Sequence, residues 1–346
     1  MISEGVRNWL LSSDDPSVRY YALRDIEGKR AHNTVVQRCR RSIRESKIIS
    51  RIFEKQKRGG NWEGVDSPYL PKYKASYWQV MILGQLGLDN GDARIQRACD
   101  HIFDFQHPEG GFSSDTPATA MREYHWRKRH GKNVPERKAW IARKLHESQL
   151  SCLTGNIAAA LIRFGYGNDR RLKKALSWLC DVQYRDGGWL CPYWSAHEDD
   201  NHGCFYGTIS PLEALSEVPR SMRTRVMQKT VDKGTEFMLM HGLFRADHHG
   251  HRVINRSWLR FTFPRFSGYD ILRGMDVLTK LGIVTDKRMN EAIRLVEGKR
   301  TRDGNWSLES APTGRMHVNI ERIGRPSKWI TLIALRVLKR LGRDTA

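Results

Sequence analysis

One short pattern constrains this chain more than any other feature, because it recurs four times. In each copy a helical stretch ends in a glycine-containing turn and an aromatic residue. The copies lie at 56–62 (QKRGGNW), 106–112 (QHPEGGF), 183–189 (QYRDGGW) and 300–306 (RTRDGNW), with a degenerate fifth at 241–244 (HGLF). Recurrence at intervals of tens of residues is typical of proteins built from repeated structural units.

The residue types in the pattern predict a structural role for it. The stretches before the second and third copies carry apolar residues three and four positions apart, which indicates amphipathic helices. Glycine ends such helices readily because it adopts a left-handed turn at little cost. The aromatic residue is expected to pack back, and the glutamine to hydrogen-bond the backbone of the neighbouring unit. We therefore interpret each copy as a staple between helix pairs.

More apolar helical segments follow most of these copies. They are predicted at 75–88, 152–167, 204–218, 268–282 and 327–342. Several are apolar nearly all round, so they should be buried on both sides. Buried inner helices surrounded by amphipathic outer helices form an α/α toroid, which makes the predicted fold all-α.

The domain prediction is a single toroid domain over residues 1–346. Residues 1–30 are expected to hold one extra helix, with Asp15 as its N-cap and Pro16 in its first turn. The helix-pair repeats are expected over residues 35–346. The chain shows no long Pro/Gly/Ser linker that would divide it.

Net charge narrows the class of partner. The formal charge is +21, which attracts nucleic acid, acidic glycans, diphosphates and anionic membranes alike. The sequence has no zinc-finger spacing and no arginine-rich tail, so specific nucleic-acid recognition is not expected. No apolar run reaches membrane-spanning length, and the first residues do not resemble a signal peptide. Six scattered cysteines favour the reducing cytoplasm.

The four copies resemble the QW repeat of the terpenoid cyclase and protein prenyltransferase superfamily, which includes the squalene cyclases. A closer likeness is to squalene-cyclase-like proteins of bacteria and archaea that consist of one toroid. That likeness covers most of the chain and is carried by SVRYYALRDI, PKYKASYW, CLTGN, DGGWLC, INRSWLRFTFPRFSGYDILRG and GRPSKWITLIALRVLK. The resemblance implies a central cavity and, together with the aromatic and basic helix starts considered below, favours an enzyme of the cyclase or prenyltransferase type that acts on an isoprenoid.

Cyclases of this superfamily that protonate their substrate use an Asp-x-Asp-Asp motif. The nearest match here is HEDD, in which His197 replaces the first acid. The match would make Asp199 the proton donor, with Glu198 or Asp200 raising its pKa. A polar surface loop rich in turn residues is the alternative interpretation of this segment.

Prenyltransferases of this fold bind a catalytic zinc ion through Asp, Cys and His. Cys152, Cys191, His202 and Cys204 lie at or near the starts of predicted inner helices, so they would meet if adjacent helices begin at one rim. Four such side chains would make a tetrahedral N/S site. The alternative is that the cysteines are small buried residues of the core.

The first turns of the predicted inner helices, and the segments beside them, are polar and aromatic. The candidate substrate-binding residues are Lys74, Tyr77, Trp78, Asn156, Arg265, Arg325, Lys328 and Trp329. The candidate catalytic residues besides Asp199 are Tyr206, Tyr269 and Asp270. Aromatic walls, cations and one or two acids would suit a substrate with an apolar body and an anionic head, such as an isoprenoid diphosphate.

Two other functions remain open from the sequence. An acidic-polysaccharide lyase or binding protein would fit the positive charge, since some such lyases are α/α toroids. A non-catalytic basic scaffold could instead bind nucleic acid or a protein partner. A peripheral membrane contact is compatible with the charge and with an isoprenoid substrate.

Overall fold

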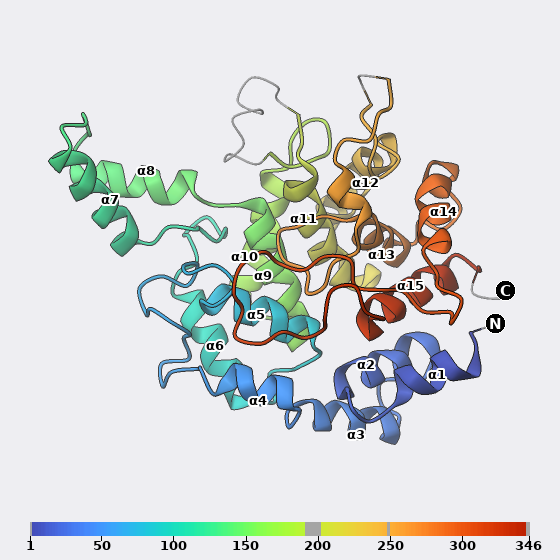
Figure 1. The fold of residues 1–346 in the computed structure, drawn as a ribbon. Coiled ribbons are helices and arrows are strands. Elements are labelled where there is room, and N and C mark those ends of the chain that lie inside the picture. The colour runs from blue at the N-terminus through green and yellow to red at the C-terminus, as the bar shows by residue number, and fades with distance from the viewer. Residues whose placement is uncertain (1, 191–201, 248–249, 344–346) are drawn as a thin grey trace.

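Every regular element in the described part of the protein is helical. The computed structural model describes residues 2–190, 202–247 and 250–343. Within these ranges it has 15 α-helices and no β-strand, only isolated bridges. Figure 1 shows the helices gathered around a central region, with one hairpin standing away from it. The prediction of an all-α chain is confirmed.

Five buried helices form most of an inner ring. They are α5 (Ser76–Gln85), α9 (Ser151–Phe164), α11 (Phe205–Glu217), α13 (Ile271–Leu281) and α15 (Lys328–Arg340). Each packs against the next along the chain. Most of their residues are buried on all sides, as the apolar segments predicted.

The N-terminal segment closes the ring. Helix α2 (Pro16–Tyr21) continues into a π-helical turn (Ala22–Ile26), and both pack against α15. Tyr21 lies beside Gly87, just after α5. Asp15 caps α2 as predicted, because its carboxylate accepts the Val18 N–H at 3.0 Å. The predicted helix is α2 with its π-helical turn, and a further helix that was not predicted, α1 (Glu4–Leu11), precedes it.

A second set of helices covers the ring. These outer helices are α3 (Thr34–Ile43), α6 (Ala93–Phe103), α10 (Arg170–Asp181), α12 (Arg225–Met240) and α14 (Asn290–Gly298). They pack on α2, α5, α9, α11 and α13 in that order, while α1 packs on α15. The short helix α4 (Lys47–Phe53) follows α3. An inner ring inside an outer ring is the predicted α/α toroid.

The glutamines of the repeated motif join neighbouring outer helices. Gln56, Gln106 and Gln183 each donate from Nε2 to a backbone carbonyl of the next outer helix, at 2.9 Å in all three cases. The same nitrogens also reach a glycine carbonyl in their own turn. The predicted hydrogen bond between units is therefore confirmed. In the fourth copy Arg300 takes the place of the glutamine and bonds the Gly304 carbonyl.

The aromatic residues of the motif tie each turn to the inner ring. Trp62, Phe112, Trp189 and Trp306 are completely buried. Their backbone N–H groups donate, at 2.8–3.1 Å, to hydroxyls in the first turns of the next inner helices, those of Ser76, Thr154, Thr208 and Thr331. The three indole N–H groups donate to carbonyls in the preceding outer segment. Each of the three tryptophans thus links an outer helix end, through its indole, to an inner helix start, through its backbone N–H.

A basic hairpin was not predicted from the sequence. Helices α7 (Pro117–Arg129) and α8 (Arg137–Glu147) pack on each other and project from the ring in Figure 1. Residues 117–147 hold nine Lys or Arg against three Glu, which places about six of the 21 excess positive charges here. The described residues also include 3₁₀ turns at Arg220–Met222, Arg256–Leu259 and Lys287–Met289.

The helices of the ring are apolar but short. No helix in the described part of the chain combines the length and the apolar character needed to cross a bilayer.

Gly155 tests the close contact between α9 and α11. A Cβ at this position would lie 2.4 Å from the Ser210 carbonyl carbon and 2.5 Å from the Pro211 nitrogen. We expect Gly155→Ala to lower the free energy of unfolding by at least about 1–3 kcal/mol, because backbone must move to admit the methyl group. Denaturant unfolding followed by circular dichroism measures this.

Gly5→Ala is the matched control. Gly5 lies on an exposed face of α1, and a Cβ added there would have no atom within 4 Å, so alanine should stabilise the helix by up to about 1 kcal/mol. Equal effects of the two substitutions would contradict the close packing of α9 against α11.

Candidate functional site

Two cavities lie along the axis of the inner ring, at opposite ends. The first turns of α5, α9 and α11 line a cavity of about 540 Å³. The last turns of α5, α9 and α11, the second half of α13 and the end of α2 with its π-helical turn line another of about 280 Å³, together with α15 along most of its length. Helices α5, α9 and α11 therefore run parallel around the axis. We call the first cavity the aromatic chamber and the second the charged chamber.

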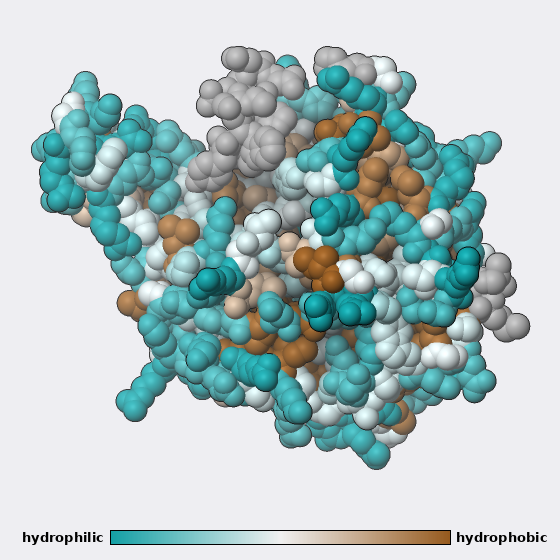
Figure 2. Space-filling model, viewed as in Figure 1, coloured by the Kyte–Doolittle hydropathy of each residue, from teal (hydrophilic) through white to brown (hydrophobic). Residues whose placement is uncertain are grey.

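Three aromatic rings, packed against one another at tilted angles, form the wall of the aromatic chamber. The Trp78 ring lies 5.2 Å from Tyr69 and 5.0 Å from Tyr73, measured between centroids. Its indole Nε1 donates to the Tyr69 carbonyl at 2.7 Å, which fixes the ring plane. Met81, Leu150, Leu153 and Tyr206 complete the apolar lining. Figure 2 shows hydrophobic side chains gathered near the centre of this face, over α5, within a hydrophilic surround.

Among the described residues, the polar side chains that line the aromatic chamber besides its tyrosines are Lys72, Ser114, Cys152, Asn156 and Ser267. Exposed Lys72 lies at its edge, with Nζ 5.8 Å from the Tyr69 ring centroid. Cys152 and Asn156 lie on its α9 side. An apolar cavity with a small number of polar side chains is the usual form of a small-molecule site.

A loop before α13 separates the two chambers. Phe266 packs on Tyr73 and Trp78 and so belongs to the aromatic side. The next residue back, Arg265, lines the charged chamber. The side-chain amide of Gln85 holds this loop in place, because it accepts the Arg265 N–H at 2.8 Å and donates to the Arg265 carbonyl.

One completely buried arginine anchors that loop to the ring. Arg273 of α13 donates from Nη1 to the carbonyls of Phe266 and Gly268, which belong to the loop. Its Nε donates to Glu213 at 2.8 Å, and its Nη2 donates to Asn156 at 2.8 Å and to Ser210 at 3.3 Å. All five guanidinium N–H groups are thus used. Three inner helices and the loop meet at this side chain.

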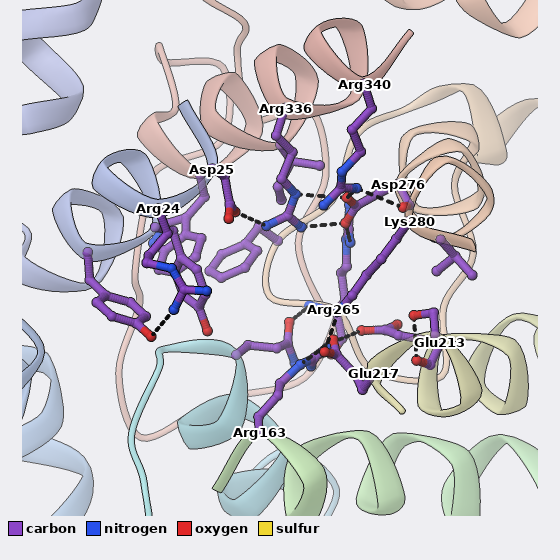
Figure 3. A pocket seen from close by; sticks show the side chains of 18 residues that line it. Arg24, Asp25, Arg163, Glu213, Glu217, Arg265, Asp276, Lys280, Arg336 and Arg340 are labelled. Carbon is purple, nitrogen blue, oxygen red and sulfur yellow. Dashed lines mark hydrogen bonds and ion pairs between the residues drawn. The ribbon is translucent and has the colours of Figure 1, made fainter. Parts of the chain in front are cut away.

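Ion pairs fill the walls of the charged chamber, as Figure 3 shows. Asp276 accepts from Arg265 at 2.8 Å, from Arg340 at 3.0 Å and from Arg336. Across the chamber Arg163 pairs with Glu217 at 2.7 Å and with Glu213. Six cationic and four acidic side chains line the cavity, so its walls carry an excess of two positive charges.

The cations control the protonation of these acids. Burial by itself would raise the pKa of Asp276, but Arg336, Arg265 and Arg340 outweigh it and hold the pKa well below its ordinary value. Burial opposes ionisation of Glu213 in the same way, and Arg273, Arg163 and Arg265 lower its pKa. Both acids therefore stay charged at neutral pH.

Arg265 has hydrogen-bonding capacity that its surroundings do not use. The residue is 7% exposed, and Nη1 pairs with Asp276. Its Nε and Nη2 are buried and have no hydrogen-bond partner among the described residues. Buried donors without partners are costly, so this guanidinium is the group in the charged chamber that most favours a bound anion.

Sequence reasoning placed some residues at these cavities. Trp78, Cys152, Asn156 and Tyr206 line the aromatic chamber. Arg265 and Trp329 line the charged chamber, where the Trp329 ring stacks on Phe263 at 4.3 Å. The structure therefore divides the predicted rim between the two ends of the ring.

The side chains of two candidate catalytic residues, Asp270 and Tyr269, are hydrogen-bonded to backbone groups. Asp270 caps α13, accepting the Arg273 N–H at 2.8 Å and the Thr262 N–H at 3.1 Å. Tyr269 donates its hydroxyl to the Leu243 carbonyl at 2.6 Å. Burial raises the pKa of both groups. Neither side chain lines the aromatic chamber or the charged chamber.

The other candidate binding residues lie outside both chambers. Tyr77 is completely buried and packs edge-on against Phe112. Lys328 pairs with Asp14 at 2.6 Å. Arg325 is exposed, and the backbone carbonyl of Lys74 accepts a hydrogen bond from His317.

The predicted zinc ligands and proton donor are described only in part. Asp199 and Cys191 lie outside the described residues. Cys204 and His202 line a third cavity, whereas Cys152 lines the aromatic chamber. Among the described His, Cys, Asp and Glu side chains, the group close enough to share a metal ion consists of His202, His241 and Asp247.

The charged chamber was missed by sequence reasoning, although a signal for it exists. Charged residues occur four positions apart in the second halves of three otherwise apolar helices, as Glu213/Glu217, Asp276/Lys280 and Arg336/Arg340. Residues at that spacing share one face of a helix. Each of these six side chains lines the charged chamber.

Solved structures with a similar arrangement of helices are known, although their sequences differ from this one. No protein-family model and no curated protein matches the sequence. The solved structure of the type II terpene cyclase MstE from Scytonema is similar over 95% of this chain and 87% of that one, with 15% identity and a TM-score of 0.44. A variant of that cyclase in complex with geranylgeranyl dihydroxybenzoate, named as its substrate, is similar over 96% and 87%, with the same identity and score.

A protein from Actinoplanes is similar over 96% of this chain and 90% of that one, with 14% identity and a TM-score of 0.43. Because these identities and TM-scores are low, we assign the toroid from the contacts between helices of this chain and not from the comparisons.

Arg273 gives a direct test of the loop anchor. We expect Arg273→Lys to lower the free energy of unfolding by about 3–5 kcal/mol, because an ammonium cannot serve all the acceptors and Glu213 loses its planar partner. Arg122→Lys is the control, since Arg122 forms an exposed pair with Asp66 that is worth about 0–1 kcal/mol. Denaturant unfolding of both variants measures these losses of stability. A similar small decrease in the free energy of unfolding of each would contradict the role of Arg273 as an anchor of the loop.

Proposed function

We propose that the protein binds an isoprenoid-type substrate, with an apolar body and an anionic head, in the aromatic chamber. We further propose that it acts on this substrate as an enzyme of the terpenoid cyclase or prenyltransferase type. The observation that carries the proposal is the aromatic chamber itself, a cavity of about 540 Å³ with three packed rings on one wall. The resemblance of the four motif copies to the QW repeat supports the same substrate class.

The lining fits the two parts of such a substrate. Burying an apolar chain contributes about 0.8 kcal/mol per CH₂ group, so a prenyl chain against Trp78, Met81 and Leu153 gains several kcal/mol. Lys72 at the edge of the chamber would pair with the anionic head. The faces of Trp78, Tyr73 and Tyr206 would stabilise a cationic carbon formed during cyclisation or prenyl transfer.

A protonating reaction would require an acid beside the substrate. Asp270 is buried with a raised pKa, but two backbone N–H groups already occupy its carboxylate. Asp199 therefore remains the proposed acid for a protonating reaction. The aromatic lining serves cyclase and transferase chemistry equally, because both pass through a carbocation.

Binding of farnesyl diphosphate tests the proposal without assuming a reaction. We expect saturable quenching of tryptophan fluorescence, since Trp78 lies in the wall. Met81→Trp should weaken binding more than tenfold by filling the chamber, whereas Met222→Trp, at an exposed position in a 3₁₀ turn, should leave binding unchanged. Lys72→Ala should weaken the diphosphate by about two- to fivefold and leave farnesol unaffected, the effect of one exposed ion pair.

Several outcomes would count against the proposal. If neither the diphosphate nor the alcohol bound, the aromatic chamber would not be an isoprenoid site. Equal weakening by Met81→Trp and Met222→Trp would place the ligand elsewhere on the protein.

A second candidate function is binding of a small anion in the charged chamber. Arg265, with its unpaired Nε and Nη2, is the observation that favours it. A cavity of about 280 Å³ admits phosphate, diphosphate or a small carboxylate rather than a chain of sugars. Of the acidic ligands considered from the sequence, this cavity would therefore take a small one and not a polysaccharide.

Thermal unfolding in phosphate or diphosphate, against chloride at equal ionic strength, tests this second candidate. We expect the anion to raise Tm, because a ligand that binds only the native state stabilises it. The rise should be smaller in Arg265→Lys, which loses N–H donors, than in the exposed control Arg302→Lys. Identical shifts in the two variants would mean that anions bind elsewhere.

A further inference from the structure

Beyond the two chambers, three potential metal ligands meet beside the start of α11. His241 directly follows α12, His202 lies two residues before the N-cap of α11, and Asp247 lies in the loop after α12. The ligand atoms that these residues offer lie within 4.8 Å of one another. Three separate segments of the chain therefore bring nitrogen and oxygen donors to one point.

Hydrogen bonds fix both imidazole rings in the same way. His241 Nδ1 lies 2.7 Å from the Phe237 carbonyl, and His202 Nδ1 lies 2.9 Å from the Gly203 carbonyl. A carbonyl oxygen only accepts, so each Nδ1 carries a hydrogen and donates it. Each ring therefore directs Nε2 toward Asp247. Histidines that ligate metals are held by this type of bond from the other ring nitrogen.

The distances to Asp247 match a shared metal better than a hydrogen bond. His241 Nε2 lies 3.4 Å from Oδ1, and His202 Nε2 lies 3.8 Å from Oδ2. Hydrogen bonds from N–H to oxygen span about 2.7–3.2 Å. Ligand atoms at about 2.0–2.1 Å from a tetrahedral zinc ion lie roughly 3.3–3.4 Å apart. The His241 separation matches this value, and the His202 separation, which goes to the other carboxylate oxygen, is about 0.4 Å longer.

Packing around the group holds the ligands in place. The Phe205 ring packs edge-on against His241 at 5.3 Å, and the Phe237 ring contacts both imidazoles. Asp186, the acid of the third motif copy, accepts the Gly203 N–H at 2.6 Å and the Gly188 N–H at 2.9 Å. The motif turn therefore positions the residue next to His202, which is a second role for this copy.

We infer that His202, His241 and Asp247 bind one divalent transition-metal ion, and we assign zinc because zinc enzymes use two histidine nitrogens and one carboxylate oxygen. A cavity of about 230 Å³, lined in part by His202, His241 and Tyr206, lies beside the group and leaves room for a further ligand. Zinc sites with three protein ligands and one open position are catalytic in type. This ligand set differs from the cysteine set predicted from the sequence.

A metal at this position would act on a ligand oxygen in the neighbouring cavity. Tyr206 lines both that cavity and the aromatic chamber, so the two spaces share a wall. A zinc ion supplies Lewis acidity and lowers the pKa of a bound water. The inference itself does not depend on the proposed isoprenoid function, because it rests on ligand geometry.

Metal content measured by mass spectrometry tests the inference on the full chain. Protein stripped with chelator and reloaded with zinc should retain about one zinc ion per chain after gel filtration. Asp247→Asn and His241→Gln should each bind zinc at least about tenfold more weakly. His130→Gln is the matched control, because His130 also follows a helix and bonds a carbonyl through Nδ1, and it should bind zinc like the wild type.

Cobalt substitution keeps the test decisive if His241→Gln fails to fold. The half-buried position of Asp247 makes Asp247→Asn the milder change, and circular dichroism will show whether each variant is folded. Wild-type protein with cobalt should give visible bands of a four- or five-coordinate ion that Asp247→Asn weakens. No zinc uptake by the wild type would overturn the inference. A thiolate charge-transfer band, or zinc binding that both variants retain, would also overturn it.

Discussion

The buried guanidinium of Arg273 is the interaction on which the centre of this protein depends. A charge without solvent is stable only if every donor finds an acceptor, and Arg273 meets that condition through α9, α11 and the loop before α13. These bonds hold the loop that contains Phe266 and Gly268 in one position between the two chambers. Without that anchor, two loop carbonyls and Glu213 would be left without this partner.

The blocked axis explains why the two ends of the ring differ chemically. Helices α5, α9 and α11 run parallel and give one end their first turns and the other end their last turns, whereas α15 lines the second end from Trp329 to Arg340. On one side of the loop, Phe266 joins Trp78 and Tyr73 in an apolar wall. On the other side, Arg265 joins a network of ion pairs centred on Asp276. A ligand of mixed character is thus expected at the first end and a small anion at the second.

Local patterns in the sequence predicted the helices of the ring, but they could not predict contacts between residues far apart in the chain. Helical spacing and glycine turns are local signals, so the inner helices and the motif copies were found. The projecting hairpin α7–α8 was missed because most of its surface is polar and it buries little. Asp270 looked catalytic but caps α13, while His241 and Asp247 were overlooked because their meeting with His202 depends on the fold.

A crystal structure of the protein with a non-hydrolysable farnesyl diphosphate analogue would show whether the aromatic chamber holds the substrate. We expect electron density for the prenyl chain between Trp78 and Tyr206, with the head near Lys72 and the Arg273 contacts unchanged. Density for a chain that passes through the position of Phe266 and Arg265 would contradict the division of the axis. An analogue bound only in the charged chamber would contradict the assignment of the aromatic chamber to the substrate.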